Sequence, residues 1–203
     1  NVECHTTTCK ASDCCYRFAP ETYQVLKTAL FECLQESPAG NCSNFFDAVD
    51  GTGQPHGAIS EWDVSRIISM RELFWNKHQF NADISKWDVS RVTDMFKLFM
   101  WAQSFDQDIS KWNVGSVRTL EYTFHFESTS TYFNSDLSKW DVSRVTNMHA
   151  TFHRAYGFNG DVSKWNVGRV TMMNGMFQYA RVFNSDVSLW NVERGPKMGS
   201  MFA

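Results

Sequence analysis

Hydrophobic residues along most of this chain recur in one fixed order, with polar residues between them at fixed positions. The order is clearest from residue 84 to residue 105, which reads ISKWDVSRVTDMFKLFMWAQSF. Counted from its Trp, the pattern returns at intervals of 25, 25, 28, 25 and 25 residues, at Trp62, Trp87, Trp112, Trp140, Trp165 and Trp190. A period in this range predicts an array of stacked coils, each formed by one repeat.

Two segments of each repeat differ in their hydrophobic period. Around the Trp the order is apolar-x-x-Trp-x-Val-x-x-Val, and this alternation predicts one short strand with Trp and Val facing inward. Met or Leu follows the Trp, and a Phe comes four residues later, as in Met70 and Phe74. That spacing predicts one short helix, which Ser69 and Glu72 would begin as a capping box. We therefore expect an α/β repeat array whose successive strands pair in parallel.

The array should cover residues 59–203, with about five and a half repeats of 25 residues. Each repeat closes with a second Phe, usually in Phe-Asn-x-Asp, where Asn and Asp favour a turn. These Asp residues could suggest calcium, but one Asp per repeat is better explained by turn capping. An outward Trp row could stack on sugars, but its alternation with Val favours core packing.

Residues 1–58 form a different, cysteine-rich segment. All six cysteines of the chain lie there: Cys4, Cys9, Cys14, Cys15, Cys33 and Cys42. Adjacent cysteines at 14 and 15, and the lack of paired CxxC motifs, favour disulfides over zinc, although Cys33 could pair with Cys42 or with the N-terminal cluster. Helical spacing from Pro20 to Ser37 predicts one amphipathic helix. We interpret the segment as a disulfide-bonded helical cap on the array.

Composition narrows the class of protein. The net charge is −3 and the basic residues are spread out, so nucleic-acid binding has little electrostatic support. No apolar run is long enough to span a membrane, and disulfides indicate an extracellular or other oxidising lumenal compartment. Because the chain starts at Asn1 without Met, we expect that a leading segment was removed or not recorded. Asn41 lies in a possible glycosylation acceptor.

The phrase W-[DN]-V-S-x-V-T-x-M-x-x-x-F-x-x-A-x-x-F-N-x-D-[IV]-S resembles the BspA-like repeat of bacterial, mycoplasmal and protist surface proteins, a divergent leucine-rich repeat. The resemblance covers about residues 59 to 203. It implies a leucine-rich-repeat-like, right-handed solenoid that is displayed outside the cell and binds other proteins. It implies no shared catalytic residues.

Polar residues beside the predicted strands are the first candidate binding site. If Trp and Val point inward, these neighbours form exposed rows, which provide either a recognition surface or only a charge-balanced, solvated sheet. The rows contain Lys86, Asp88, Arg91, Lys111, Asn113, Lys139, Asp141, Arg144, Lys164, Asn166 and Arg169.

A second candidate is an apolar patch on the expected helical side, which could contact a partner. It comprises Trp75, Met100 and Trp101, together with Phe202 at the end of the array. The long interval contains three extra residues near Ser128 and Thr129. Such an insertion either contributes to a binding surface or is only tolerated there, and the sequence favours neither alternative.

Three histidines are a remote candidate for a metal site. His149 and His153 are four residues apart, and His125 holds the place of His153 one repeat earlier. The HxxxH spacing lacks the central Glu of a metalloprotease, so surface histidines are the favoured interpretation. We predict no cofactor.

The sequence therefore predicts a non-enzyme that acts as an extracellular or lumenal protein-interaction or adhesion module, with a glycan as a further possible ligand. The alternative is a structural subunit of a larger assembly. That alternative rests on the C-terminal end of the array, which we expect a partner or further sequence to cover.

Overall fold

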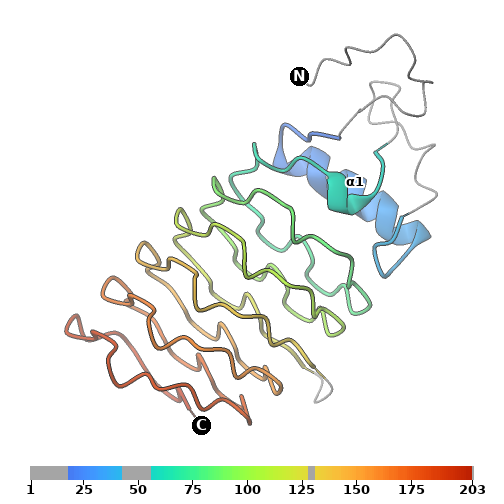
Figure 1. Ribbon diagram of the computed structural model, residues 1–203. Helices are drawn as coiled ribbons and strands as arrows, with labels where there is room; N and C mark the ends of the chain where they lie inside the picture. Colours follow the sequence, from blue (N-terminus) through green and yellow to red (C-terminus); the bar gives the residue numbers. More distant parts are fainter. Residues whose placement is uncertain (1–17, 43–55, 128–130, 203) are drawn as a thin grey trace.

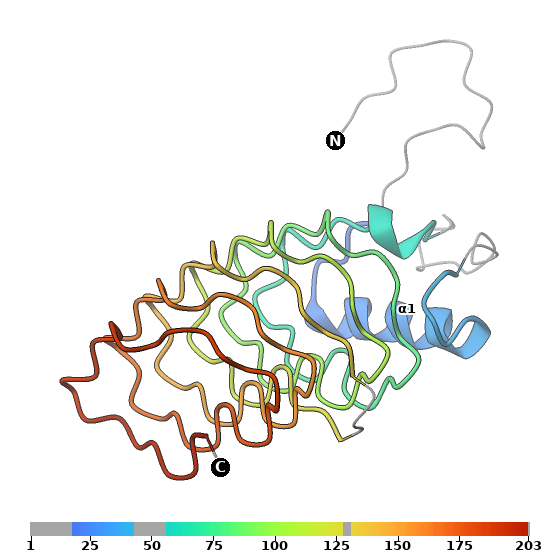
Figure 2. The same ribbon diagram turned by 60° about the horizontal axis from the view of Figure 1, so that its bottom comes forward.

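A computed structural model describes residues 18–42, 56–127 and 131–202 of this protein. An N-terminal helix is followed by coils that stack in sequence order (Figures 1 and 2). Isolated parallel β-bridges join successive coils through Ser69, Asp94, Thr119, Asn147, Met172 and Lys197. Neighbouring repeats therefore pair in parallel, as the period predicts.

The expectation of one helix per repeat is wrong for the described coils. Their helical content is the short 3₁₀ element η1, Ile59–Glu61. The segment that begins at Met70 instead forms consecutive turns, in which the Leu73 N–H donates to the Met70 carbonyl over 3.2 Å. Between those two residues, Glu72 has a φ of 59°, which rules out the expected capping box because a right-handed helix requires negative φ.

Hydrogen bonds to the next coil replace the expected helical ones. The Met70 N–H donates to the Asp94 carbonyl over 2.9 Å, and the Phe74 N–H donates to the Leu98 carbonyl over 3.0 Å. A backbone N–H that donates to the next coil is not available for a helical hydrogen bond within its own coil. The stacking of the coils therefore decides the backbone conformation of this segment. Met70 and Phe74 are nevertheless both fully buried, as predicted.

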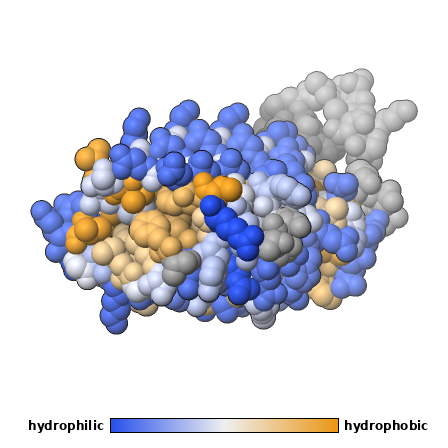
Figure 3. Space-filling model, turned by 90° about the horizontal axis from the view of Figure 1, so that it is seen from below, coloured by the Kyte–Doolittle hydropathy of each residue, from blue (hydrophilic) through white to orange (hydrophobic). Residues whose placement is uncertain are grey.

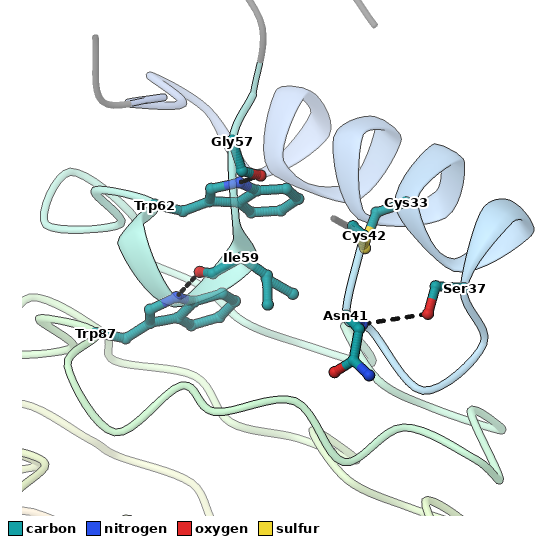
Figure 4. The surroundings of a disulfide bond; sticks show 8 residues. All are labelled: Cys33, Ser37, Asn41, Cys42, Gly57, Ile59, Trp62 and Trp87. Atoms are coloured by element: carbon teal, nitrogen blue, oxygen red, sulfur yellow. Dashed lines mark hydrogen bonds between the residues drawn. A yellow bond between two sulfur atoms is a disulfide. The ribbon is translucent and has the colours of Figure 1, made fainter. Parts of the chain in front are cut away.

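The predicted strand at Trp and Val is also misplaced, because the bridges lie seven residues after each Trp. The Trp segment is itself a turn, and the Trp87 N–H donates to the Ile84 carbonyl over 3.1 Å. The inward orientation is confirmed: all six Trp side chains of the row are buried, so an outward sugar-stacking row is excluded. The indole of Trp87 donates to the Ile59 carbonyl of the preceding coil over 2.9 Å (Figure 4).

Phenylalanine rings fill the core in two parallel stacks. In the first stack, Phe99 lies between Phe74 and Phe124, with ring centroids 5.2 Å and 5.7 Å away. The second Phe of each repeat builds the other stack, and Phe105 lies 3.9 Å from Phe99 within one coil. Each internal ring thus contacts its own coil and both neighbours, which explains why one repeat cannot fold alone.

The cap contains helix α1, Tyr23–Glu36, which begins after the N-cap Thr22 and buries Leu26, Leu30 and Cys33. The predicted amphipathic helix is confirmed, although it begins after Pro20. A disulfide joins Cys33 to Cys42 at the end of the helix (Figure 4), which confirms one of the two pairings that the sequence left open. The other four cysteines lie outside the described residues.

The cap packs directly against the first coil. The Phe18 carbonyl accepts from the Asp63 N–H over 2.7 Å, and the Tyr23 hydroxyl donates to the Arg71 carbonyl over 2.6 Å. Gly40, at a φ of 90°, lies so close to Phe80 that an added Cβ would be 2.9 Å from its ring. A side chain at this position would therefore separate the cap from the core.

Apolar side chains are exposed on the last coil. The exposed side chains there are Val182, Leu189, Val192, Met198 and Phe202, with Leu189 at 86% and Phe202 at 59%. Figure 3, viewed from the side of the C-terminal coil, shows apolar atoms gathered in this region. The expected apolar surface at this end is therefore present in the structure.

Candidate interaction surface

The turns that follow the β-bridges present side chains that differ from repeat to repeat. We call this surface the bridge face. Its members are Arg71, Glu72, Trp75, Asn76, Phe96, Lys97, Trp101, Glu121, Tyr122, His125, His149, His153, Arg154, Gln178 and Tyr179. Because the same turns carry the buried Met and Phe of the core, the bridge face is held rigidly against the array.

Trp75 and Trp101 begin the bridge face on the first two coils. Their ring centroids lie 6.1 Å apart with the planes tilted by 44°, and Trp75 is 41% exposed. The Lys97 ammonium lies 5.6 Å from the Trp75 ring and 4.9 Å from the Phe96 ring. Trp75 and Trp101, two members of the apolar patch expected from the sequence, therefore lie beside each other, with a cation over the aromatic surface.

Met100 does not belong to an exposed patch, contrary to the expectation from the sequence. It is 8% exposed, whereas Trp75 at the same position of the first coil is 41% exposed. Met100 lies in an interior coil with neighbours on both sides, which accounts for its burial. Ser128 and Thr129 of the insertion lie outside the described residues.

The middle of the bridge face is a row of aromatic and imidazole rings. The His125 and His153 rings stack with centroids 4.4 Å apart and planes 3° from parallel. His149 bonds through both ring nitrogens, to the Tyr122 hydroxyl and to the Asn174 carbonyl, each over 2.8 Å. Tyr179 contacts the His153 ring edge at 5.7 Å.

The three histidines do not form a metal site in this arrangement. Imidazole lone pairs lie in the ring plane, so two stacked rings point their nitrogens in parallel rather than toward one ion. The third ring already uses both nitrogens. Among the described residues no group of three or more His, Cys, Asp and Glu is placed to hold a metal ion.

Several buried polar atoms of the bridge face have no hydrogen-bond partner. They are Nε1 of Trp101, Nδ1 of His125, Nδ1 of His153 and Nε of Arg154. A buried donor without a partner costs roughly 1–3 kcal/mol. Their location on three successive coils marks one region where hydrogen-bonding capacity is unused.

Burial and nearby basic groups perturb the pKa of His125. Burial, followed by the nearby His153, Arg154, His149 and Lys97, lowers the pKa of His125 to about 3. Burial and then Arg154 also lower the pKa of His153. Both rings are therefore neutral near pH 7, and the positive charge of this region comes from Lys97 and Arg154.

The polar rows proposed from sequence lie beside the Trp segments and are exposed, including Lys111, Lys139 and Arg144. Between two coils they border a hollow of about 430 Å³, to which Asn113 and Asp141 contribute. The Asp141 carboxylate accepts the Ser143 N–H over 3.0 Å, and hydrogen bonds from Ser143 lower its pKa. The hydrogen bond between the Asp141 carboxylate and the Ser143 N–H therefore stabilises the local turn.

The Asp residues of the Phe-Asn-x-Asp motif cap turns, as expected. The Asp83 carboxylate accepts the Ser85 N–H over 2.9 Å, and the Asp108 carboxylate accepts the Ser110 N–H over 2.9 Å. Hydrogen bonds from these serines lower the pKa of both carboxylates. The side-chain amide oxygen Oδ1 of the nearby Asn81 accepts the Asp106 N–H of the next coil over 2.9 Å.

A family model described as "Mycoplasma protein of unknown function, DUF285" matches residues 40–132 and 125–203. The chain belongs to the DUF285 family. Its two matches include the whole array of coils and the end of the cap, so the family assignment rests on the repeats. No match was found among curated proteins or among solved structures. Across the described part of this DUF285 protein, no helix is long and apolar enough to cross a membrane.

Proposed function

We propose that this DUF285 protein is a non-catalytic, cell-surface module that binds other proteins, built as a leucine-rich-repeat-like, right-handed solenoid. The mycoplasma-associated family and the disulfide between Cys33 and Cys42 support a location outside the reducing cytosol. The rigid stacked core supports a binding role, because it holds a long surface with little ordering cost on association.

The bridge face is the proposed recognition surface. The observation that carries this assignment is that aromatic and cationic side chains gather where the repeats differ, while Trp, Met and Phe of the interior repeats are buried in the core. Trp, Tyr and Arg dominate the energetics of protein interfaces, and Trp75, Tyr179 and Arg154 supply all three. The polar rows beside the Trp segments instead keep the ordinary composition of a solvated surface.

Binding to intact cells tests this proposal. The fluorescently labelled chain is added to cultured cells before and after protease treatment, and bound label is measured by flow cytometry. We expect binding that protease removes, that the double variant Trp75→Ser, Tyr179→Ser abolishes, and that the control Lys111→Gln, Lys139→Gln retains. Equal binding by the bridge-face variant would refute the assignment of this surface.

A structural role remains the second candidate, and the exposed apolar side chains of the last coil favour it. Two copies that meet through Leu189 and Phe202 would bury this surface. Light scattering at increasing concentrations checks the idea, with Leu189→Lys as the disrupting variant. A monomer at all concentrations would reject it.

A further inference from the structure

Several basic side chains lie around His125. We call Lys97, His125, His149, His153 and Arg154 the basic cluster. All the neighbouring groups that perturb the pKa of His125 are basic, and no carboxylate is among those that perturb His153. The basic surroundings are those of His125 and His153; beside His149, burial and then the Glu121 carboxylate raise the pKa of Tyr122, and that carboxylate accepts from the Asn147 side chain over 2.8 Å.

The two permanent charges of the cluster lack an ion-pair partner within the described part of the chain. Lys97 lies over the Trp75 and Phe96 rings, and the Arg154 guanidinium lies 5.6 Å from the Tyr179 ring. By contrast, Arg71 on the same face pairs with Asp94 over 3.7 Å. Aromatic contacts leave most of a cation's hydrogen-bonding capacity free for an anion.

Unused donors lie in the same place. The Trp101 indole N–H and the Arg154 Nε–H are buried without a partner, and both groups can only donate. The Trp101 N–H of the backbone bonds the His125 carbonyl over 2.9 Å, and the Phe126 N–H bonds the His153 carbonyl over 3.1 Å, so these residues lie on adjoining coils. Because these two side-chain donor atoms are buried, the side-chain charges of Lys97 and Arg154 are what would meet a ligand, and they call for negatively charged acceptor oxygens.

We propose that the basic cluster binds carboxylates of an acidic segment in a partner protein, while Trp75, Trp101 and Tyr179 pack against apolar side chains of that segment. This rests on the bridge face being the recognition surface. Lys97 and Arg154 lie two coils apart, which is about 10 Å along the stack, or about three residues of an extended peptide. An extended segment with acidic residues at such a spacing reaches both charges.

A protein segment fits better than a sugar. Sugar stacking needs an open, flat aromatic face, whereas the Lys97 ammonium lies over the Trp75 ring at 5.6 Å and that ring is tilted by 44° against Trp101. The combination of aromatic side chains and Arg matches the centre of a protein interface, where charge pairs are shielded from water.

Fluorescence anisotropy with a labelled random copolymer of Glu and Tyr tests the proposal. We expect the chain to bind this probe, and not a copolymer of Lys and Tyr. The double variant Lys97→Gln, Arg154→Gln should weaken binding at least about tenfold, as loss of two charge-assisted contacts requires. The matched double variant Lys111→Gln, Lys139→Gln carries the same change of charge on another surface and should bind normally.

A second measurement guards against misfolding. Circular dichroism of the double variant Lys97→Gln, Arg154→Gln should show the same thermal transition as the unchanged chain, so that a weaker affinity reports the loss of the two charges. Equal affinity in all variants would overturn the proposal. So would binding of polygalacturonate with the same affinity and the same dependence on Lys97 and Arg154, because the site would then recognise polyanionic sugars.

The two proposals fail in different ways. If the variant at Trp75 and Tyr179 abolishes cell binding while the variant at Lys97 and Arg154 retains it, the recognition surface stands and the acidic partner is rejected. If neither variant changes cell binding, both proposals are rejected.

Discussion

Substituting the same core position in an interior coil and in the last coil tests whether stacking supplies the stability of the array. Phe99 and Phe202 hold one position of the repeat, but Phe99 is fully buried between two coils and Phe202 is 59% exposed. Phe99 contacts Phe74, Phe105 and Phe124, with centroids between 3.9 Å and 5.7 Å away. Phe202 has a neighbouring coil on one side alone, where Phe177 lies 5.7 Å away.

The expected losses differ severalfold. Phe99→Ala removes a fully buried ring and leaves a cavity, which lowers the free energy of unfolding by about 3–5 kcal/mol. Phe202→Ala gives up less than half of that burial and leaves no enclosed cavity, so about 1 kcal/mol or less is expected. Phe99→Leu retains most of the volume and should cost below about 1.5 kcal/mol.

Equilibrium urea unfolding, followed by Trp fluorescence and far-ultraviolet circular dichroism, measures these differences. The decisive quantity is the ratio of the losses in unfolding free energy caused by Phe99→Ala and Phe202→Ala, because the two substitutions remove the same side chain. Equal losses at Phe99 and Phe202 would show that contacts within one coil, rather than stacking between coils, determine stability.

Three further predictions concern a histidine, the disulfide and a buried hydroxyl. Because the pKa of His125 is lowered to about 3 from 6.5, the unfolded chain binds this proton more readily, so stability should fall as pH drops below about 6.5. Allowing for the partial exposure of His125, the free energy of unfolding should fall by about 1–2 kcal/mol between pH 7 and pH 5. Denaturant titrations at the two pH values should show a smaller fall for His125→Leu than for the unchanged chain. Cys33→Ser with Cys42→Ser should lower the free energy of unfolding by ~2–3 kcal/mol, as measured by urea titration; an unchanged transition would contradict a stabilising bond. Thr151→Val removes a buried hydroxyl that lies 2.9 Å from the Met148 carbonyl of its own coil and 3.1 Å from the Leu120 carbonyl of the preceding coil. The loss should lower the unfolding free energy by about 1 kcal/mol, more than Thr171→Val at an exposed site.

The candidate surface was predictable only in part. Trp75 and Trp101 stood out because they depart from the repeat, and the structure brings their rings together. Met100 was misassigned because exposure depends on whether a coil has neighbours on both sides. The three histidines of the basic cluster were recognisable from their places in the repeat, but Lys97 and Arg154 were not, since they are 57 positions apart and only the stacking of coils brings their surroundings together.

The sequence by itself determined the period, the cap helix and which side chains of the repeat face inward. These follow from hydrophobic burial, which depends on side-chain type and repeats wherever the type repeats. The tertiary structure decided the backbone conformation. A Met and a Phe four residues apart suit a helix, yet the Met70 and Phe74 N–H groups bond the next coil, so turns replace it. Backbone hydrogen bonds can be satisfied locally or between coils, and the choice is made only when the coils stack.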